Sequence, residues 1–158
     1  MTFAVKLVHD EPRLVYLALV YHLGRPGADL DIDTKAPGAH GLRDVKVALG
    51  SDLDSESAII DLDGEQYRKL LSAIYGCVNE LRVYHMRGGA GGTTARFNET
   101  ARALFPAIAA DAVAALAVAH ARMMLRRRLE RAVERAAAAD AAGSESRRAG
   151  RRSWPFGR

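Results

Sequence analysis

The stretch Ser57–Gly89, SAIIDLDGEQYRKLLSAIYGCVNELRVYHMRGG, contains the clearest local pattern in the chain. Its first residues, Ser57–Leu62, are typical of a β-strand. Asp63 then stands where a side-chain oxygen can accept hydrogen bonds from the free N–H groups of a first helical turn. Gln66, three residues further on, completes a capping box. The pattern therefore predicts a strand followed directly by a helix over Gly64–Arg87.

The predicted helix over Gly64–Arg87 is amphipathic. Its apolar residues recur at steps of three and four, so they lie on one face. Gly76 lies on the opposite side, where glycine costs about 1 kcal/mol relative to alanine. We interpret it as a tolerated weakness, the alternative being close approach of another backbone. The apolar face consists of Tyr67, Leu70, Leu71, Ile74, Cys77, Val78, Leu81 and Tyr84.

The N-terminal residues predict a second strand and a second helix. Apolar and other side chains alternate over Thr2–Val8, which is the pattern of a half-buried strand. A helix is predicted over Glu11–Leu23, because Asp10 and Pro12 suit its first turn and a glycine and a proline follow its end. A buried strand is the rival interpretation. Since Leu14–Tyr21 has no polar face, it must be covered in the core or in a subunit contact.

Gly24–Gly41 is predicted to be a loop, and it contains the alternating aspartates Asp29, Asp31 and Asp33. A calcium loop needs glycine at position six and glutamate at position twelve, where this chain has threonine and histidine. The preferred interpretation is a short edge strand with solvated aspartates, whose charges discourage edge-to-edge pairing. Asp44–Leu49 is a further short element whose type the sequence leaves open.

The C-terminal half is predicted to be helical. A short helix begins at Thr94 or Asn98 and ends at Phe105, before a proline. A long alanine-rich helix follows over about Asp111–Ala139. The preceding RGGAGGTT, Arg87–Thr94, is interpreted as a helix end and hinge, because a phosphate-binding P-loop follows a strand and ends in Gly-Lys-Ser/Thr. Residues 143–158 lack an apolar period and are predicted to form a disordered basic tail.

Composition and charge define the class of protein. The 158 residues are 49% hydrophobic, enough for one domain with its own core. Residues 1–105 hold twelve Lys/Arg against fourteen Asp/Glu, whereas residues 106–158 hold eleven against five. The basic excess is thus C-terminal, which points weakly to an anionic partner. The abundance of alanine and arginine is typical of a high-GC bacterial coding bias.

No residue pattern predicts catalysis, a metal or a cofactor. The single cysteine, Cys77, lies within an apolar pattern and is interpreted as a buried hydrophobe. No two histidines are spaced to bind metal from one helix face. An enzyme with a site built from Glu80, Tyr84 and His85 is the remaining catalytic alternative. The histidines are His9, His22, His40, His85 and His120.

Arginines of the last helix and the tail are the candidate contact residues. At 100° per residue, Val118, Leu125, Leu129, Ala132, Val133 and Ala136 form one stripe, and Arg127, Arg128, Arg131 and Arg135 lie on the other side. Glu130 and Glu134 lie within reach of them, as on a solvated face. The alternative is a surface for nucleic-acid phosphates. The candidates are Arg126, Arg127, Arg128, Arg131, Arg135, Arg147, Arg148, Arg151 and Arg152.

These observations predict a single compact α+β domain over residues 1–142 that is mostly helical. Two or three short strands pack on the helix Gly64–Arg87, and a long Ala/Arg-rich helix follows. We expect a non-catalytic interaction or regulatory protein that self-associates through helices. The homodimer would use the alanine stripe Val113–Ala136 or the apolar segment Leu14–Tyr21. Another protein or nucleic acid is the alternative partner.

The predicted location is the cytoplasm. A lone cysteine suits a reducing compartment, and Met1–Val8 is too short for the apolar region of a secretion signal. No membrane helix is predicted, because the most apolar run, Ala107–Leu125, is mostly alanine and contains charged residues.

Overall fold

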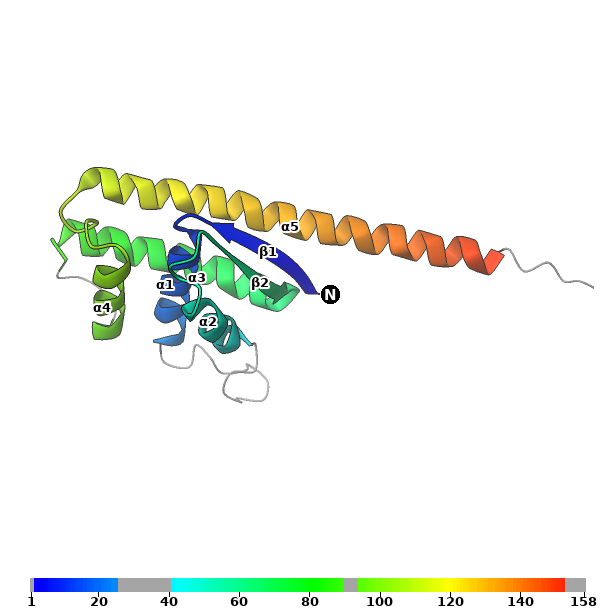
Figure 1. Ribbon diagram of the computed structural model, residues 1–158, viewed down its shortest axis with the longest axis horizontal. Helices are drawn as coiled ribbons and strands as arrows, with labels where there is room; N and C mark the ends of the chain where they lie inside the picture. Colours follow the sequence, from blue (N-terminus) through cyan, green and yellow to red (C-terminus); the bar gives the residue numbers. More distant parts are fainter. Residues whose placement is uncertain (1, 26–40, 90–93, 153–158) are drawn as a thin grey trace, which may run out of the picture.

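The computed structural model describes residues 2–25, 41–89 and 94–152, with side chains described as far as Gly143 (Figure 1). These residues form a predominantly helical α+β fold with one two-stranded antiparallel sheet, as predicted. The elements in chain order are β1 (Thr2–Val8), α1 (Glu11–Leu23), α2 (Leu42–Gly50), β2 (Ser57–Asp63), α3 (Gly64–Met86), α4 (Ala95–Leu104) and α5 (Ala112–Arg152).

The sheet pairs β1 with β2 along their whole length. Thr2 lies opposite Asp63 and Val8 opposite Ser57, so the two ends of the ladder are in register. One face of the pair is buried and the other is exposed, as the period-two pattern requires. The buried face consists of Val5 and Leu7 from β1 and Ala58, Ile60 and Leu62 from β2. Both predicted strands are confirmed.

Helix α1 lies at the centre of the core. It packs against α2, α3, α4 and α5, with a smaller contact to β1. Five successive apolar positions in it are fully buried: Leu14, Val15, Leu17, Ala18 and Leu19. The predicted helix over Glu11–Leu23 is confirmed, and its apolar segment is covered by the same chain. A homodimer through Leu14–Tyr21 is therefore not available without opening the core.

The N-terminus of α3 carries the predicted capping box. The Oδ1 atom of Asp63 accepts hydrogen bonds from the backbone N–H groups of Glu65 and Gln66, both at 2.8 Å. In return the Asp63 N–H donates to Oε1 of Gln66 at 2.8 Å. This reciprocal cap satisfies donors that a helix leaves free, and it fixes the turn from β2 into α3. The helix ends at Met86, one residue before the predicted Arg87.

The element whose type the sequence left open, Asp44–Leu49, is part of helix α2. Gly41 precedes it with φ of 68°, a left-handed conformation that glycine adopts without steric cost. Leu42, Val45 and Leu49 face the core. The calcium-loop and edge-strand alternatives for Asp29–Asp33 lie outside the described residues. The same is true of the glycines within 90–93.

Helix α5 lies along β1 and α3 and then extends past the rest of the protein (Figure 1). It reaches Arg152, beyond the predicted end at about Ala139. Alanine and arginine have high helix propensities, and Gly143 alone is too weak to end such a helix. The backbone of 143–152, assigned to the tail from sequence, is thus helical, whereas 153–158 lie outside the described residues. A domain boundary at Ala142 stays a prediction.

Gly76 has a packing role that the sequence analysis did not assign to it. A Cβ atom at this position would lie 2.4 Å from Cε1 of Tyr21 in α1. The Tyr21 ring also packs edge-on against Phe97 of α4, with ring centroids 6.1 Å apart. The interpretation as a tolerated weakness is therefore wrong. The glycine lets an aromatic ring, not a backbone, approach α3.

We predict that Gly76→Ala destabilises the protein despite the higher helix propensity of alanine. The clash with Tyr21 costs about 1–3 kcal/mol, which exceeds the propensity gain of about 1 kcal/mol. Urea unfolding followed by circular dichroism measures the change. In a Tyr21→Leu background the same substitution should be neutral or stabilising. Gly64→Ala is the matched control, because nothing lies within 4 Å of its added Cβ.

Candidate interaction surfaces of helix α5

One side of α5 faces the core, as the predicted stripe requires. Val118, Leu125, Leu129 and Ala132 are buried against the rest of the chain. Val133 and Ala136, at the end of the stripe, are only partly covered. The helix contacts β1, α1 and α3 on this side. The predicted inward position of Val118, Leu125, Leu129 and Ala132 is thus confirmed.

The opposite side of α5 carries large apolar side chains that its own chain leaves uncovered. Val113, Leu116 and Met123 are 72%, 69% and 53% exposed, and their spacing of three and seven places them on one face. His120 is the only polar residue in Ala112–Ala121, AVAALAVAHA, so this segment is apolar around its circumference. A helix of that kind is normally buried on all sides. Here one side faces solvent.

Two of the candidate arginines are engaged by carboxylates. Arg126 Nε lies 2.7 Å from Oε1 of Glu130 one turn later, and this hydrogen bond raises the pKa of the Arg126 side chain. Arg128 Nε lies 2.9 Å from Oε2 of Glu11. The prediction that placed Arg128 on the solvated face is therefore wrong. Its side chain turns toward the beginning of α1.

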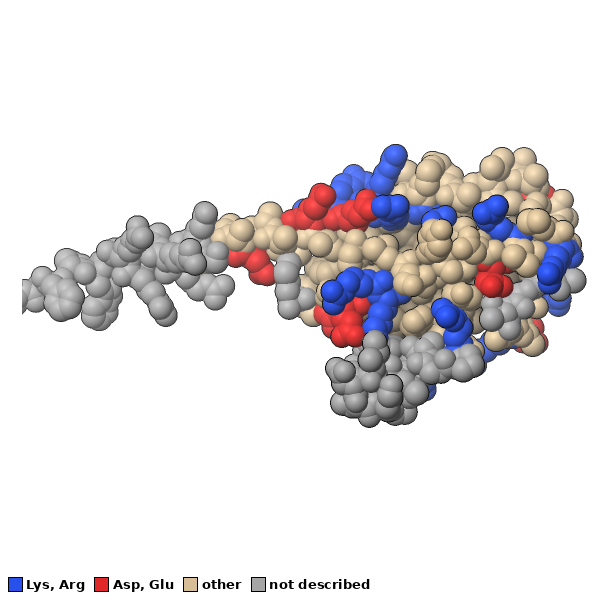
Figure 2. Space-filling view, turned by 180° about the vertical axis from the view of Figure 1, so that it is seen from behind, with Lys and Arg blue, Asp and Glu red and all other residues tan. Residues whose placement is uncertain are grey.

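The other candidate arginines differ in how they are placed. Arg127, Arg131 and Arg135 are exposed at four-residue steps. Within the described part of the chain none of them forms an ion pair, and Arg131 and Arg135 donate to backbone carbonyls of the preceding turn. On the face seen in Figure 2, basic side chains lie in separate groups with acidic ones between them. The side chains of Arg147, Arg148, Arg151 and Arg152 lie outside the described residues.

Glu11 is a buried charged residue that the sequence analysis did not single out. It is 3% exposed, the only charged residue buried among those described. Its carboxylate accepts a hydrogen bond from the Val8 N–H at 2.9 Å in addition to the contact with Arg128. A buried carboxylate needs such partners, since desolvation penalises an unpaired charge. The pair therefore ties the β1–α1 turn to the middle of α5.

A hollow of about 450 Å³ lies beside this ion pair, and Glu11 and Arg128 are among its lining residues. The turn after β1 contributes His9, in a left-handed conformation with φ of 55°, and Asp10, and α5 contributes His120. The lining contains no serine, threonine or cysteine that could act as a nucleophile. No group of three or more histidine, cysteine, aspartate or glutamate residues in the described ranges is arranged to hold a metal.

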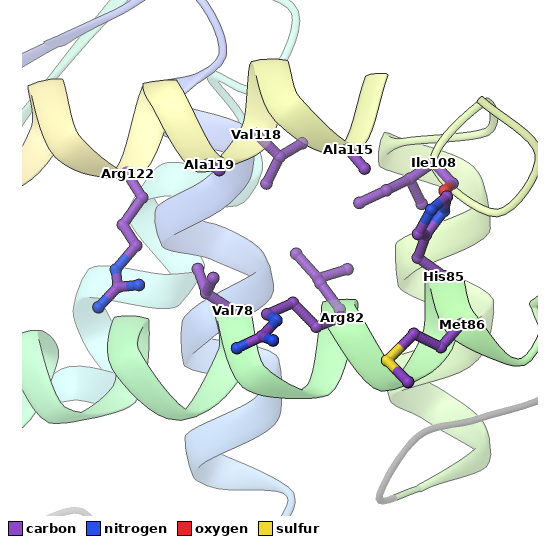
Figure 3. A pocket seen from close by; sticks show the side chains of 10 residues that line it. Val78, Arg82, His85, Met86, Ile108, Ala115, Val118, Ala119 and Arg122 are labelled. Atoms are coloured by element: carbon purple, nitrogen blue, oxygen red, sulfur yellow. The ribbon is translucent and has the colours of Figure 1, made fainter. Parts of the chain in front are cut away.

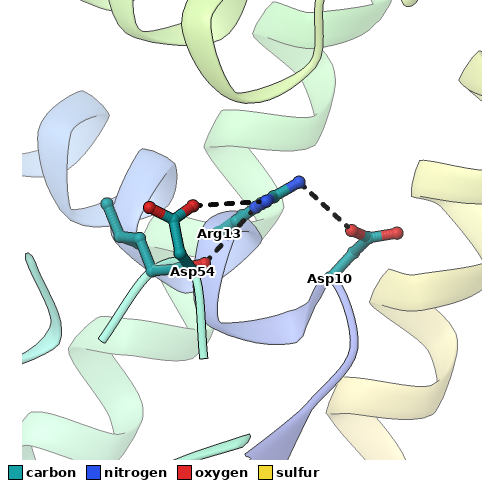
Figure 4. A network of polar contacts seen from close by, with 4 residues as sticks. Asp10, Arg13 and Asp54 are labelled. Carbon is teal, nitrogen blue, oxygen red and sulfur yellow. Dashed lines mark hydrogen bonds and ion pairs between the residues drawn. The ribbon is translucent and has the colours of Figure 1, made fainter. Parts of the chain in front are cut away.

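Asp10 is also engaged beside this hollow. Arg13 lies between Asp10 and Asp54, with Nη1 to Oδ1 of Asp10 at 4.0 Å and Nη2 to Oδ1 of Asp54 at 3.5 Å (Figure 4). The Arg13 Nε also donates to the Leu53 carbonyl at 3.4 Å. These contacts fasten the beginning of α1 to the connection between α2 and β2. They are exposed, so each adds little to stability.

The catalytic alternative built from Glu80, Tyr84 and His85 does not form one site. Tyr84 is 2% exposed and part of the core. The His85 Nδ1 is hydrogen-bonded to the Ile108 carbonyl. Cys77 is fully buried, and burial raises the pKa of its thiol, which keeps it protonated and unreactive at neutral pH. That the protein is not an enzyme stays a prediction.

Comparisons with known proteins give no match among protein-family models, curated proteins or solved structures. Among the described helices, none combines the length and apolarity needed to cross a bilayer.

We predict that Arg128→Met lowers the free energy of unfolding by about 1–3 kcal/mol, because Glu11 stays buried without its cation. The arginine is partly solvent-exposed, which keeps the loss below that of a fully buried pair. Arg127→Met, one position away on the exposed side, should change stability by less than about 0.5 kcal/mol. Urea unfolding compares the two variants. An equal effect of both would show that the Glu11 contact contributes nothing specific.

Proposed function

We propose that this protein is a non-catalytic interaction protein that self-associates through the outward face of α5. The observation that carries the proposal is the apolar circumference of Ala112–Ala121, of which the chain covers one side only. A second copy supplies the missing cover. Burial of Val113, Leu116 and Met123 then gives the association free energy, because apolar area leaves water.

An antiparallel arrangement of two α5 helices about a two-fold axis fits this face best. In a parallel pair, Arg127 and Arg131 would each lie beside the same residue of the other copy, and like charges repel. In an antiparallel pair centred near His120, Arg127 lies beside the first turn of the other helix. Asp111 is located there and supplies an opposite charge. The apolar residues then meet between these charged ends.

Exposed apolar residues elsewhere in the protein do not form a comparable face. Val47 of α2 is 73% exposed and Ile59 of β2 is 67% exposed, and each belongs to a different element. Single exposed apolar side chains are normal on protein surfaces and need no partner. Tyr75, Val83 and Met86 also share one side of α3, but the polar residues Asn79 and Arg82 lie on that side too. The row on α5 is different because it belongs to a segment that is apolar around its circumference.

We predict that Leu116→Glu and Met123→Glu each weaken self-association at least about tenfold, since each replaces a buried apolar contact by an unpaired charge. Light scattering coupled to size-exclusion chromatography at micromolar concentration measures the molar mass. Val47→Glu is the matched control and should leave the mass unchanged. A wild-type protein that is monomeric throughout this range would contradict the proposal, as would dimers that are insensitive to both substitutions.

Nucleic-acid binding is the second candidate function, and the row Arg127, Arg131 and Arg135 favours it. Their guanidinium groups are exposed along one side of α5 and have no carboxylate partner among the described residues. Successive members are about 6 Å apart along the axis at 1.5 Å per residue. Such a row can contact successive phosphates, with affinity that falls steeply as salt increases.

We predict that changing Arg127, Arg131 and Arg135 together to glutamine reduces retention on a DNA or RNA duplex at low salt at least about tenfold. Each lost phosphate contact also lowers the salt dependence of binding. Mobility-shift assays at several salt concentrations measure both effects. Wild-type protein that is not retained at low salt would exclude this function. The control is a triple glutamine variant of exposed arginines outside α5, namely Arg68, Arg87 and Arg96.

A further inference from the structure

A hollow of about 320 Å³ lies between α3 and α5 (Figure 3). Its floor is apolar and includes Val78 and Leu81 of α3 and Val118 of α5. Ile108, in the connection before α5, lies at one end. The volume falls in the range of small-molecule sites, which are mostly apolar and carry a few polar groups.

The charges around this hollow have one sign. Arg122 of α5 lies at one end of the hollow, and Arg82 of α3 lies nearer its middle with its guanidinium group pointing toward Arg122 (Figure 3). None of the ten lining residues is acidic. Within the described parts of the chain, neither arginine forms an ion pair. The surface is therefore suited to an anion whose charge sits beside an apolar group.

The hollow ends at Arg122, because the side chain of this residue packs on α3. Its guanidinium carbon lies 4.9 Å from the centre of the Tyr75 ring. Past this contact a second hollow begins, lined by Arg122 and Arg126 but also by Glu130. An acidic helix of a partner protein, long enough to fill both hollows, would lie beside Glu130 and be repelled by its negative charge. The segment between Ile108 and Arg122 thus favours a small ligand over a helix.

We propose that the hollow between α3 and α5 binds a small amphiphilic carboxylate. The alkyl or aryl group of the ligand packs on Val78, Leu81 and Val118. The carboxylate lies between the guanidinium groups of Arg82 and Arg122 and accepts charge-assisted hydrogen bonds from them. Val113, Leu116 and Met123 of the self-association face do not line this hollow, and Ala119 borders both surfaces.

Calorimetric titration with octanoate and octanamide, below micelle-forming concentrations, tests the proposal. The two ligands share one chain and differ in the charge of the head group. Octanoate should bind saturably and at least about fivefold more tightly than octanamide, and added salt should reduce this preference. In the variant Arg82→Gln/Arg122→Gln the two ligands should bind equally. The matched control Arg127→Gln/Arg135→Gln should keep the wild-type preference.

A second variant tests the apolar part of the site. Ala119 lines the hollow and is exposed, so Ala119→Phe fills the space without disturbing the core. It should lose binding of both ligands while thermal unfolding stays unchanged. Equal affinity of wild-type protein for octanoate and octanamide would overturn the proposal. So would octanoate binding that survives both variants, or binding of an acidic helical peptide but not of octanoate.

Discussion

The fold depends on the need to cover one helix from every side. Helix α1 has no polar face between Leu14 and Tyr21, so water must be excluded around its whole circumference. Helices α2, α3, α4 and α5 all pack on it. Strand β1, which precedes α1 in the chain, makes a smaller contact with it. Burial of this helix removes a large apolar area from water, which stabilises the fold. The amphipathic faces of its neighbours follow from this requirement.

The close packing around α1 explains two local features that look unfavourable in isolation. A glycine in the middle of α3 weakens the helix, but it gives the Tyr21 ring room between α3 and α4. A carboxylate at the beginning of α1 is buried, but Arg128 and the Val8 N–H neutralise and satisfy it. Both features belong to the contacts of α1 with distant parts of the chain. In each case a locally unfavourable residue allows a contact between elements that are distant in the sequence.

Local patterns in the sequence predicted most of the elements, because caps and periodicity act over a few residues. The strand Thr2–Val8, the helix Glu11–Leu23 and the capping box at Asp63 are examples. The pairing of Glu11 with Arg128 could not be predicted this way, since 117 residues separate them. The sequence also could not decide where the Arg128 side chain points. Arg128 lies at the edge of the exposed face, and a long side chain there can turn either to solvent or to the core. The outward apolar row was visible only once the buried side of α5 was known.

The length of α5 has a mechanical consequence. Its last residue in direct core contact on the buried stripe is Ala132, and the helix continues to Arg152. At 1.5 Å per residue the overhang is about 30 Å, so a tilt of about 10° where the helix rests on β1 displaces its tip by about 5 Å. The Glu11–Arg128 contact lies close to this fulcrum. The angle of this lever is set by the packing of Val118, Leu125, Leu129 and Ala132 on the rest of the chain together with the Glu11–Arg128 pair, and small rearrangements there are amplified at the far end.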